Sequence, residues 1–162
     1  MMTSKRHELI EAPGRPIRIE PLKLADYEEM VRLWRSAGLH YRPRGRDSRR
    51  DMARQLRLPA AVYLKAVTRA DGKSRIVGVV LGTHDGRRGW INRLAVLPEF
   101  QRLGLGRRLV AQLDKRFRAL GLDIVAVQVD KGNRASMGFF AALGYVRHSD
   151  IHYYSKRKGP WV

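Results

Sequence analysis

The segment from Trp90 to Leu109 constrains the fold more than any other part of this sequence. Residues 89–96 predict a β-strand, and Pro98, which has no amide N–H, cannot continue a strand ladder. After a turn that contains two glycines, the apolar residues take the spacing of one helical stripe, formed by Leu105, Leu109, Val110, Leu113, Phe117 and Leu120. A chain with this strand, turn and helix is expected to have a mixed fold.

The other patterns along the chain predict a single α+β (mixed α/β) domain at residues 14–162. Further strands are expected at residues 15–21, 62–68, 75–83 and 124–129, and a last hairpin or edge pair at 145–148 and 151–156. Helices are expected at residues 22–37, 105–120 and 133–143, and in the second part of 42–57. Residues 1–13 show no period and are expected to form a flexible leader.

The composition excludes several classes of protein. The chain has 162 residues and 44% hydrophobic residues, which is enough for a core and excludes a disordered basic tail, although its net charge is +18. The absence of cysteine excludes disulfides, thiolate metal sites and thiol nucleophiles, and the histidines are too scattered to predict a metal site. The apolar runs are too short to span a membrane, and we expect a cytoplasmic protein.

The turn between the strand and the helix has the features of an anion site. Gly104 and Gly106 lack the Cβ atoms that would block close approach to the first N–H groups of the helix, and Arg102, Arg107 and Arg108 add positive charge. A Rossmann fingerprint would have Gly or Ala in place of Leu109, and a P-loop would need Gly-Lys-Ser/Thr. Taken alone, the two glycines are equally compatible with a tight connection that binds nothing.

Two linked motifs resemble the GNAT superfamily of acetyl-CoA-dependent N-acetyltransferases. Leu94-Ala95-Val96, followed by Gln101-Arg102-Leu103-Gly104-Leu105-Gly106, is similar to the acetyl-CoA motif of this family. Asn133-Arg134-Ala135-Ser136, with the aromatic helix and Leu143-Gly144-Tyr145 behind it, is similar to its second signature. The resemblance covers about residues 15–156.

The resemblance implies a fold, a cofactor and a set of binding residues. The fold would be a central, mostly antiparallel twisted sheet, flanked by about four helices, with a splayed cofactor cleft. Acetyl-CoA would be the acyl donor. Its binding residues would be Leu94, Ala95, Val96, Gln101, Arg102, Leu103, Gly104, Leu105, Gly106, Arg107, Asn133 and Phe140.

The usual acid and base of the family do not carry over. Phe140 stands where relatives often have a tyrosine acid, and Trp90 and Gln128 stand where some relatives have a basic glutamate. Asp130 and Tyr145 are the candidate catalytic residues for relaying the proton, with Tyr153 and Glu99 as further possibilities. A site without a strong base suits an amine of low pKa.

The sequence therefore predicts an N-acetyltransferase that acts on a primary amine of a small molecule, protein or peptide. The alternatives are a basic module that binds nucleic acid or the ribosome, motivated by the charge, and an acyl-CoA-binding protein with little turnover. The arginines at 42–57 indicate a solvated face, or a surface for an acidic or RNA-associated partner. The resemblance also leaves a homodimer open.

Overall fold

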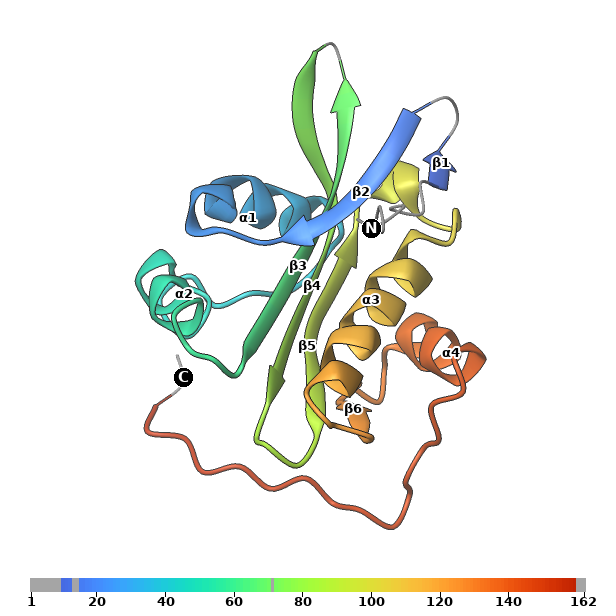
Figure 1. The fold of residues 1–162 in the computed structure, drawn as a ribbon. Helices are drawn as coiled ribbons and strands as arrows, with labels where there is room; N and C mark the ends of the chain where they lie inside the picture. Colours follow the sequence, from blue (N-terminus) through green and yellow to red (C-terminus); the bar gives the residue numbers. More distant parts are fainter. Residues whose placement is uncertain (1–9, 13–14, 71, 160–162) are drawn as a thin grey trace, which may run out of the picture.

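The computed structural model describes residues 10–12, 15–70 and 72–159, and its centre is one sheet. Six strands lie side by side in the order of the sequence (Figure 1): β1 (Ile10–Ala12), β2 (Arg15–Pro21), β3 (Ala61–Ala70), β4 (Lys73–His84), β5 (Gly89–Val96) and β6 (Val125–Val127). All neighbouring strands are antiparallel except β5 and β6, which are parallel. The sheet is therefore mostly antiparallel, as expected.

In the described part of the chain, four α-helices flank this sheet, together with two 3₁₀ turns. The helical elements are η1 (Leu24–Asp26), α1 (Tyr27–Ser36), α2 (Arg49–Gln55), η2 (Pro98–Phe100), α3 (Leu105–Ala119) and α4 (Arg134–Ala142). α1 and α2 lie on one side of the sheet, and α3 and α4 lie on the other (Figure 1). This arrangement confirms the predicted α+β fold. Among the described residues, no helix combines the length and the apolar character needed to cross a bilayer.

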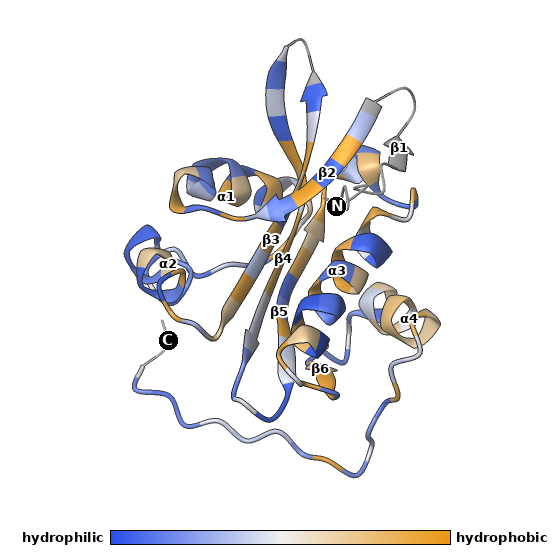
Figure 2. Cartoon of the chain, viewed as in Figure 1, coloured by the Kyte–Doolittle hydropathy of each residue, from blue (hydrophilic) through white to orange (hydrophobic). Residues whose placement is uncertain are grey.

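Glycines in the sheet allow α3 to lie directly on it. A Cβ atom on Gly78 would lie 2.9 Å from Leu109 Cδ1, and one on Gly82 would lie 2.7 Å from Leu113 Cδ1. Leu109, Leu113 and Phe117 are fully buried on the inner side of α3, and Figure 2 shows the mixed apolar and polar residues of this amphipathic helix. This packing fixes where α3 begins relative to the end of β5.

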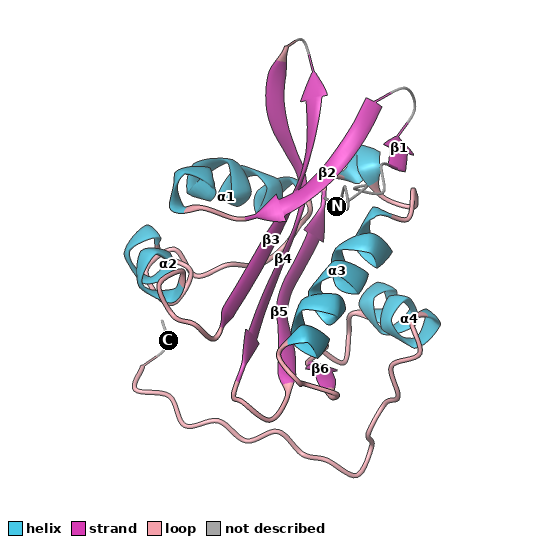
Figure 3. Ribbon diagram, viewed as in Figure 1, coloured by secondary structure: helices cyan, strands magenta, loops and turns pink. Residues whose placement is uncertain are grey.

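The C-terminal hairpin expected at 145–148 and 151–156 is wrong, because the described residues after α4 contain no strand (Figure 3). Apolar alternation predicts a strand only if a partner edge is available, and this segment pairs with none of the described strands. Its large apolar side chains are consequently exposed, with Val146 at 77%, Ile151 at 66% and Tyr154 at 88%.

The end of the expected leader, residues 10–12, contributes a short strand to the sheet. Residues 10–12 form β1, which pairs with β2 in a register that places Ile10 opposite Ile17. A strand of three residues is too short to show a period in the sequence. The rest of the leader, residues 1–9 and 13, lies outside the described residues.

Candidate active site

β5 changes its pairing in the middle, and this change creates an open strand edge. On β4, Leu81 faces Arg93 and Gly82 faces Ile91, so Asn92 is the extra residue of a β-bulge. On the other side, β6 pairs only with residues 89–91 of β5. Within the described part of the chain, residues 92–96 therefore have a strand partner on the β4 side alone.

The open edge lies between the two helical layers. Arg93 points towards the side of α2, where it contacts Asp47, whereas Val96 faces α3, with Cγ2 4.0 Å from a Cβ atom built on Gly106. The carbonyl oxygens of Asn92 and Val96 accept side-chain hydrogen bonds from Arg93 and Gln101. The other backbone groups that point away from β4 are available to an extended ligand that carries amide groups, since a strand pairs through such groups. The splayed cleft expected from the resemblance therefore has a structural basis in the bulge and the short β6.

The turn from β5 to α3 presents backbone amides at a helix start. Gln101 Nε2 donates a hydrogen bond to the carbonyl oxygen of Val96 at 2.9 Å, which fastens the turn to the strand. Gly104 has a φ of +79° and Arg102 a φ of +60°, and the second value is unusual for a residue with a side chain. Arg108 is the first residue whose N–H finds an acceptor in this helix, Gly104 O at 3.1 Å.

The N–H groups of Leu105, Gly106 and Arg107 precede that bond, so they point out of the helix start without an intrahelical acceptor. The side chains of Arg102 and Arg107 are exposed beside them, and the first turn of α3 contains no acidic residue. Helix amides and guanidinium groups both stabilise anions. The open edge of β5 thus leads directly to a seat for a phosphate-like group.

The second motif lies on α4, which contacts the start of α3. A Cβ atom on Gly106 would lie 3.3 Å from Phe139 Cε2, so glycine allows the two helices to approach closely. Asn133 is the N-cap of α4, and its side chain accepts the N–H of Ser136 at 3.0 Å. Phe140 is 6% exposed and packs edge-to-face on Phe139 and Tyr145. Asn133 is therefore exposed at the start of α4, while Phe140 belongs mainly to the core.

Tyr145, one of the two candidate catalytic residues, is directed to α3. Its hydroxyl donates to Asp114 Oδ1 at 3.4 Å. Burial, reinforced by the carboxyl of Asp114, raises the pKa of the Tyr145 phenol, so it stays protonated at neutral pH. Burial also raises the pKa of Asp114, against the opposing influence of Arg118 and of the Tyr145 hydrogen bond.

Asp130, the other candidate, lies in the loop between β6 and α4. Its side chain is exposed, and its backbone carbonyl accepts the N–H of Asn133 at 2.8 Å. The structure thus brings Asp130 beside Asn133, and no hydrogen bond among the described residues joins it to Tyr145. Glu99 is occupied by Arg75 at 2.7 Å, and its own backbone N–H and this arginine lower the pKa of its carboxyl.

A buried ion pair near the bulge was not predicted from the sequence. Asp47 is 5% exposed, and its Oδ2 lies 3.0 Å from Arg93 Nη2 and 2.8 Å from the backbone nitrogen of Arg42. The hydroxyl of Tyr27 donates to the backbone oxygen of Asp47 at 2.8 Å. The pair connects the loop before α2 to β5, next to the open edge. Since 46 residues separate its members, no local pattern indicates it.

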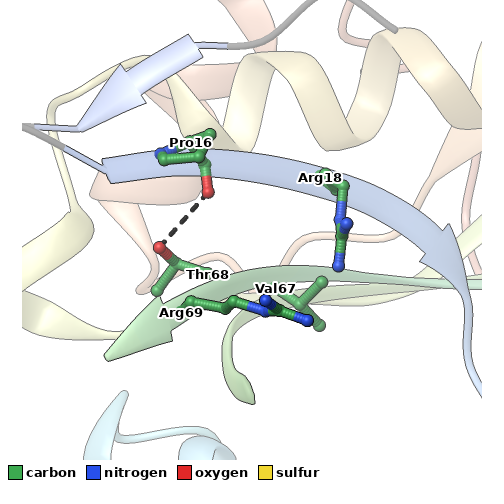
Figure 4. A pocket seen from close by; sticks show the side chains of 5 residues that line it. All are labelled: Pro16, Arg18, Val67, Thr68 and Arg69. Atoms are coloured by element: carbon green, nitrogen blue, oxygen red, sulfur yellow. Dashed lines mark hydrogen bonds between the residues drawn. The ribbon is translucent and has the colours of Figure 1, made fainter. Parts of the chain in front are cut away.

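A hollow elsewhere on the molecule lies between β2 and β3. Figure 4 shows its lining residues, Pro16, Arg18, Val67, Thr68 and Arg69. The hydroxyl of Thr68 donates to the carbonyl oxygen of Pro16 at 3.3 Å across it. This hollow is separated from β5 by β4, so it is distinct from the site at the open edge.

Comparison with known protein families decides the family of this chain. The model of the acetyltransferase (GNAT) family matches residues 27–145, which include both motifs, the open edge and the turn. The chain belongs to the GNAT family. It is accordingly an acyltransferase by family, and the resemblance found in its sequence is confirmed.

Solved structures show that this GNAT protein has the fold of N-acetyltransferases. An aminoglycoside 6'-N-acetyltransferase from Acinetobacter baumannii is similar with a TM-score of 0.69 and 18% identity, over 88% of this chain and 99% of that one. The PaiA N-acetyltransferase from Thermoplasma acidophilum, solved with coenzyme A, has a TM-score of 0.67 at 18% identity, over 78% and 87%. A ribosomal-protein alanine N-acetyltransferase from Escherichia coli has 0.64 at 19%, over 79% and 76%.

The residues of this GNAT protein fit acetyl-CoA. The pantetheine arm carries amide groups that can pair with the open edge of β5, and the pyrophosphate can accept the N–H groups at the start of α3. Arg102 and Arg107 are exposed where that negative charge would lie. A strand edge and an anion seat, joined by one tight turn, meet both chemical requirements of such a ligand.

Proposed function

We propose that this GNAT protein transfers the acetyl group of acetyl-CoA to a primary amine, with residues 14–162 as the catalytic unit. The observation that carries the proposal is the continuity between the open edge of β5, at residues 92–96, and the amides at the start of α3. The coenzyme A bound to the PaiA protein and the amine substrates named for the similar structures support the same reaction class.

We assign donor binding to residues of β5, of the turn before α3 and of α4. Leu94, Ala95 and Val96 offer backbone groups to pantetheine, and residues 101–107 hold the phosphates. Asn133, exposed at the start of α4, is assigned to the side of the arm. Phe140, which is 6% exposed, supports α4 from the core and leaves little surface for the arm. Acetyl-CoA, when bound, supplies an acyl group activated as a thioester. Backbone N–H groups near the bulge are suited to stabilise negative charge on the carbonyl oxygen.

The acceptor amine must lose its proton without a strong base at the expected positions. Trp90 and Gln128 cannot accept a proton at neutral pH. A lysine side chain is neutral in only about one of two thousand molecules at pH 7, whereas an α-amine is neutral in about one of ten. We therefore favour an amine of low pKa held close to the thioester, with Asp130 or Tyr145 taking part in proton transfer.

The test has two readouts. Thermal unfolding with and without acetyl-CoA measures binding, and free-thiol release with a panel of amines measures turnover. Acetyl-CoA should raise the melting temperature of the native protein. The rise should be smaller for Arg102→Ala/Arg107→Ala and unchanged for Lys115→Ala/Arg116→Ala, which removes two exposed charges from the other half of α3. No shift with the native protein would contradict the proposed donor site.

A second function is favoured by one observation. Phe140, Trp90 and Gln128 leave the site without the acid and base usual in the resembling family, which fits an acyl-CoA-binding protein with little turnover. This alternative predicts a rise in melting temperature with acetyl-CoA and no thiol release with any amine. Release that depends on Tyr145 or Asp130, tested with Tyr145→Phe and Asp130→Asn, would exclude it.

A further inference from the structure

The segment before and within α2 carries a dense surface of arginines. We call it the arginine surface and define it by the exposed side chains of Arg44, Arg46, Arg49, Arg50, Arg54 and Arg57. Figure 2 shows that α2 is largely hydrophilic. The like charges of these arginines repel one another, so the surface favours a partner that supplies negative charge.

The two acidic residues of this segment do not neutralise the surface. Asp47 is buried and paired with Arg93 from the sheet, and Asp51 binds Arg54 at 2.9 Å while its backbone N–H donates to the N-cap Ser48. Arg49 donates to the backbone oxygen of Leu24 at 3.3 Å, which leaves its charge in place. Among the described residues, no carboxylate lies within 4.0 Å of the guanidinium groups of Arg44, Arg46, Arg50 and Arg57.

The arginine surface lies next to the end of the donor site where acyl transfer would occur. The phosphate seat is at the start of α3, after the last residue of β5, so a bound carrier runs back along the open edge towards Asn92. Its acyl end therefore approaches the bulge. Arg93, the residue after the bulge, forms an ion pair with Asp47. Asp47 lies in the chain between Arg46 and the start of α2, so this ion pair places the arginine surface beside the bulge.

We propose that the acceptor of this enzyme is the N-terminal α-amine of an acidic polypeptide, which docks on the arginine surface. The inference rests on the proposed function and adds the class of acceptor. Guanidinium groups bind carboxylates in a bidentate manner, and an α-amine matches the missing base. Residues 42–57 contain no aromatic side chain on which a nucleobase could stack, so a carboxylate-rich peptide fits this surface better than single-stranded nucleic acid.

The same charge disfavours aminoglycosides as acceptors. An aminoglycoside carries several protonated amines, and the arginine surface repels such a polycation at the entrance to the site. Sisomicin, the aminoglycoside bound to one similar structure, is a suitable negative probe. The charge at the acceptor side therefore favours a polypeptide amine over a polycationic small molecule.

Peptide binding tests the inference separately from turnover. Three peptides begin with the same alanine, continue with five acidic, five neutral amide or five lysine residues, and carry a fluorophore at the C-terminus. Fluorescence anisotropy with the native protein should give the lowest Kd for the acidic peptide, and raising the salt from 50 to about 300 mM should weaken this binding strongly. Equal Kd values for the three peptides, or a preference for the lysine peptide, would overturn the inference.

Charge reversal locates the binding surface. Arg46→Glu/Arg50→Glu should weaken binding of the acidic peptide by about tenfold and leave the neutral peptide unchanged. Lys115→Glu/Arg116→Glu, a matched reversal on the opposite helical layer, should change both by less than about threefold. Equal losses in the two variants would mean that only net charge matters and would contradict a docking surface at α2. Melting temperatures establish that both variants are folded.

Measurements of thiol release and of RNA binding complete the test. Thiol release should be fastest with the acidic peptide and absent with sisomicin, and the Arg46→Glu/Arg50→Glu variant should raise KM for the acidic peptide with little change in kcat. Release with other amines but no preference for acidic peptides would refute this inference and leave the proposed function intact. A duplex RNA that binds the arginine surface while the acidic peptide does not would also refute it, in favour of a nucleic-acid partner.

Discussion

Asp47 Oδ2 and Arg93 Nη2 lie 3.0 Å apart, in a nearly buried ion pair that joins the loop before α2 to the residue that follows the bulge of β5. The side chains of Asp47 and Arg93 are 7% and 17% exposed, so each charge depends on the other for compensation. The pair thus fixes the arginine surface relative to the open edge. Its position makes the stability of the chain and the geometry of the acceptor side depend on the same contact.

Asp47→Asn should destabilise the protein by about 3 kcal/mol, because it leaves the guanidinium of Arg93 buried without its counter-charge. Urea denaturation measures the change. Arg54→Ala, which breaks the exposed pair with Asp51, is the control and should cost less than about 1 kcal/mol. Similar losses of stability for the two variants would show that burial does not make the Asp47–Arg93 pair more important than an exposed ion pair.

Gly104→Ala should weaken acetyl-CoA binding about tenfold, because the methyl group lies at the amides that form the phosphate seat. It should also cost about 1 kcal/mol of stability, since the φ of +79° is unfavourable for alanine. Gly121→Ala is a matched control at the other end of α3, with a φ of +76° and open space around it. Titration calorimetry should find that Gly121→Ala leaves the affinity for acetyl-CoA unchanged. A tenfold loss in this control as well would contradict the phosphate seat at the start of α3.

Asp114→Asn should leave stability at pH 7 unchanged or increase it. Burial raises the pKa of Asp114, so the folded state holds this proton more tightly than the unfolded state does. Its contribution to stability is therefore present at low pH and is lost as the pH rises through the raised pKa. Asparagine keeps an acceptor for the Tyr145 hydroxyl without the charge. Denaturation at pH 4 and pH 7 should show a smaller difference for the variant than for the native protein.

Tyr63→Phe should flatten the loss of stability at alkaline pH. Burial, with a further contribution from Asp47, raises the pKa of Tyr63 from 10.0 to about 12. Its favourable contribution is therefore complete below pH 10 and disappears as the pH rises towards about 12. At pH 7 the variant should be less stable by about 1 kcal/mol, because the hydroxyl donates to Gln55 Oε1 at 2.7 Å. Denaturation curves at pH 7 and between pH 8 and pH 12 measure both effects, with the exposed Tyr153→Phe as control.

The parts of the fold that could be predicted are those with local patterns. The helical stripe from Leu105 to Phe117 and the strand at 89–96 follow from spacing, and Gly104 adopts the left-handed conformation that its place before α3 requires. The second motif likewise predicts a helix, and the structure has α4 there with Asn133 as its N-cap. Each of these features depends on residues that are neighbours in the chain, so the sequence carries the whole signal.

The amino-acid sequence by itself determined the order of most elements, the glycine turn with its cationic charge, and the two motifs of the GNAT family. Tertiary structure alone decided that Asp47 pairs with Arg93, that the ladder between β5 and β6 ends at Ile91, and that residues 145–159 pair with none of the described strands. These outcomes depend on contacts between distant segments and on which strand edges remain available. Spacing within one segment contains no information about either, because burial and pairing arise only when the segments meet.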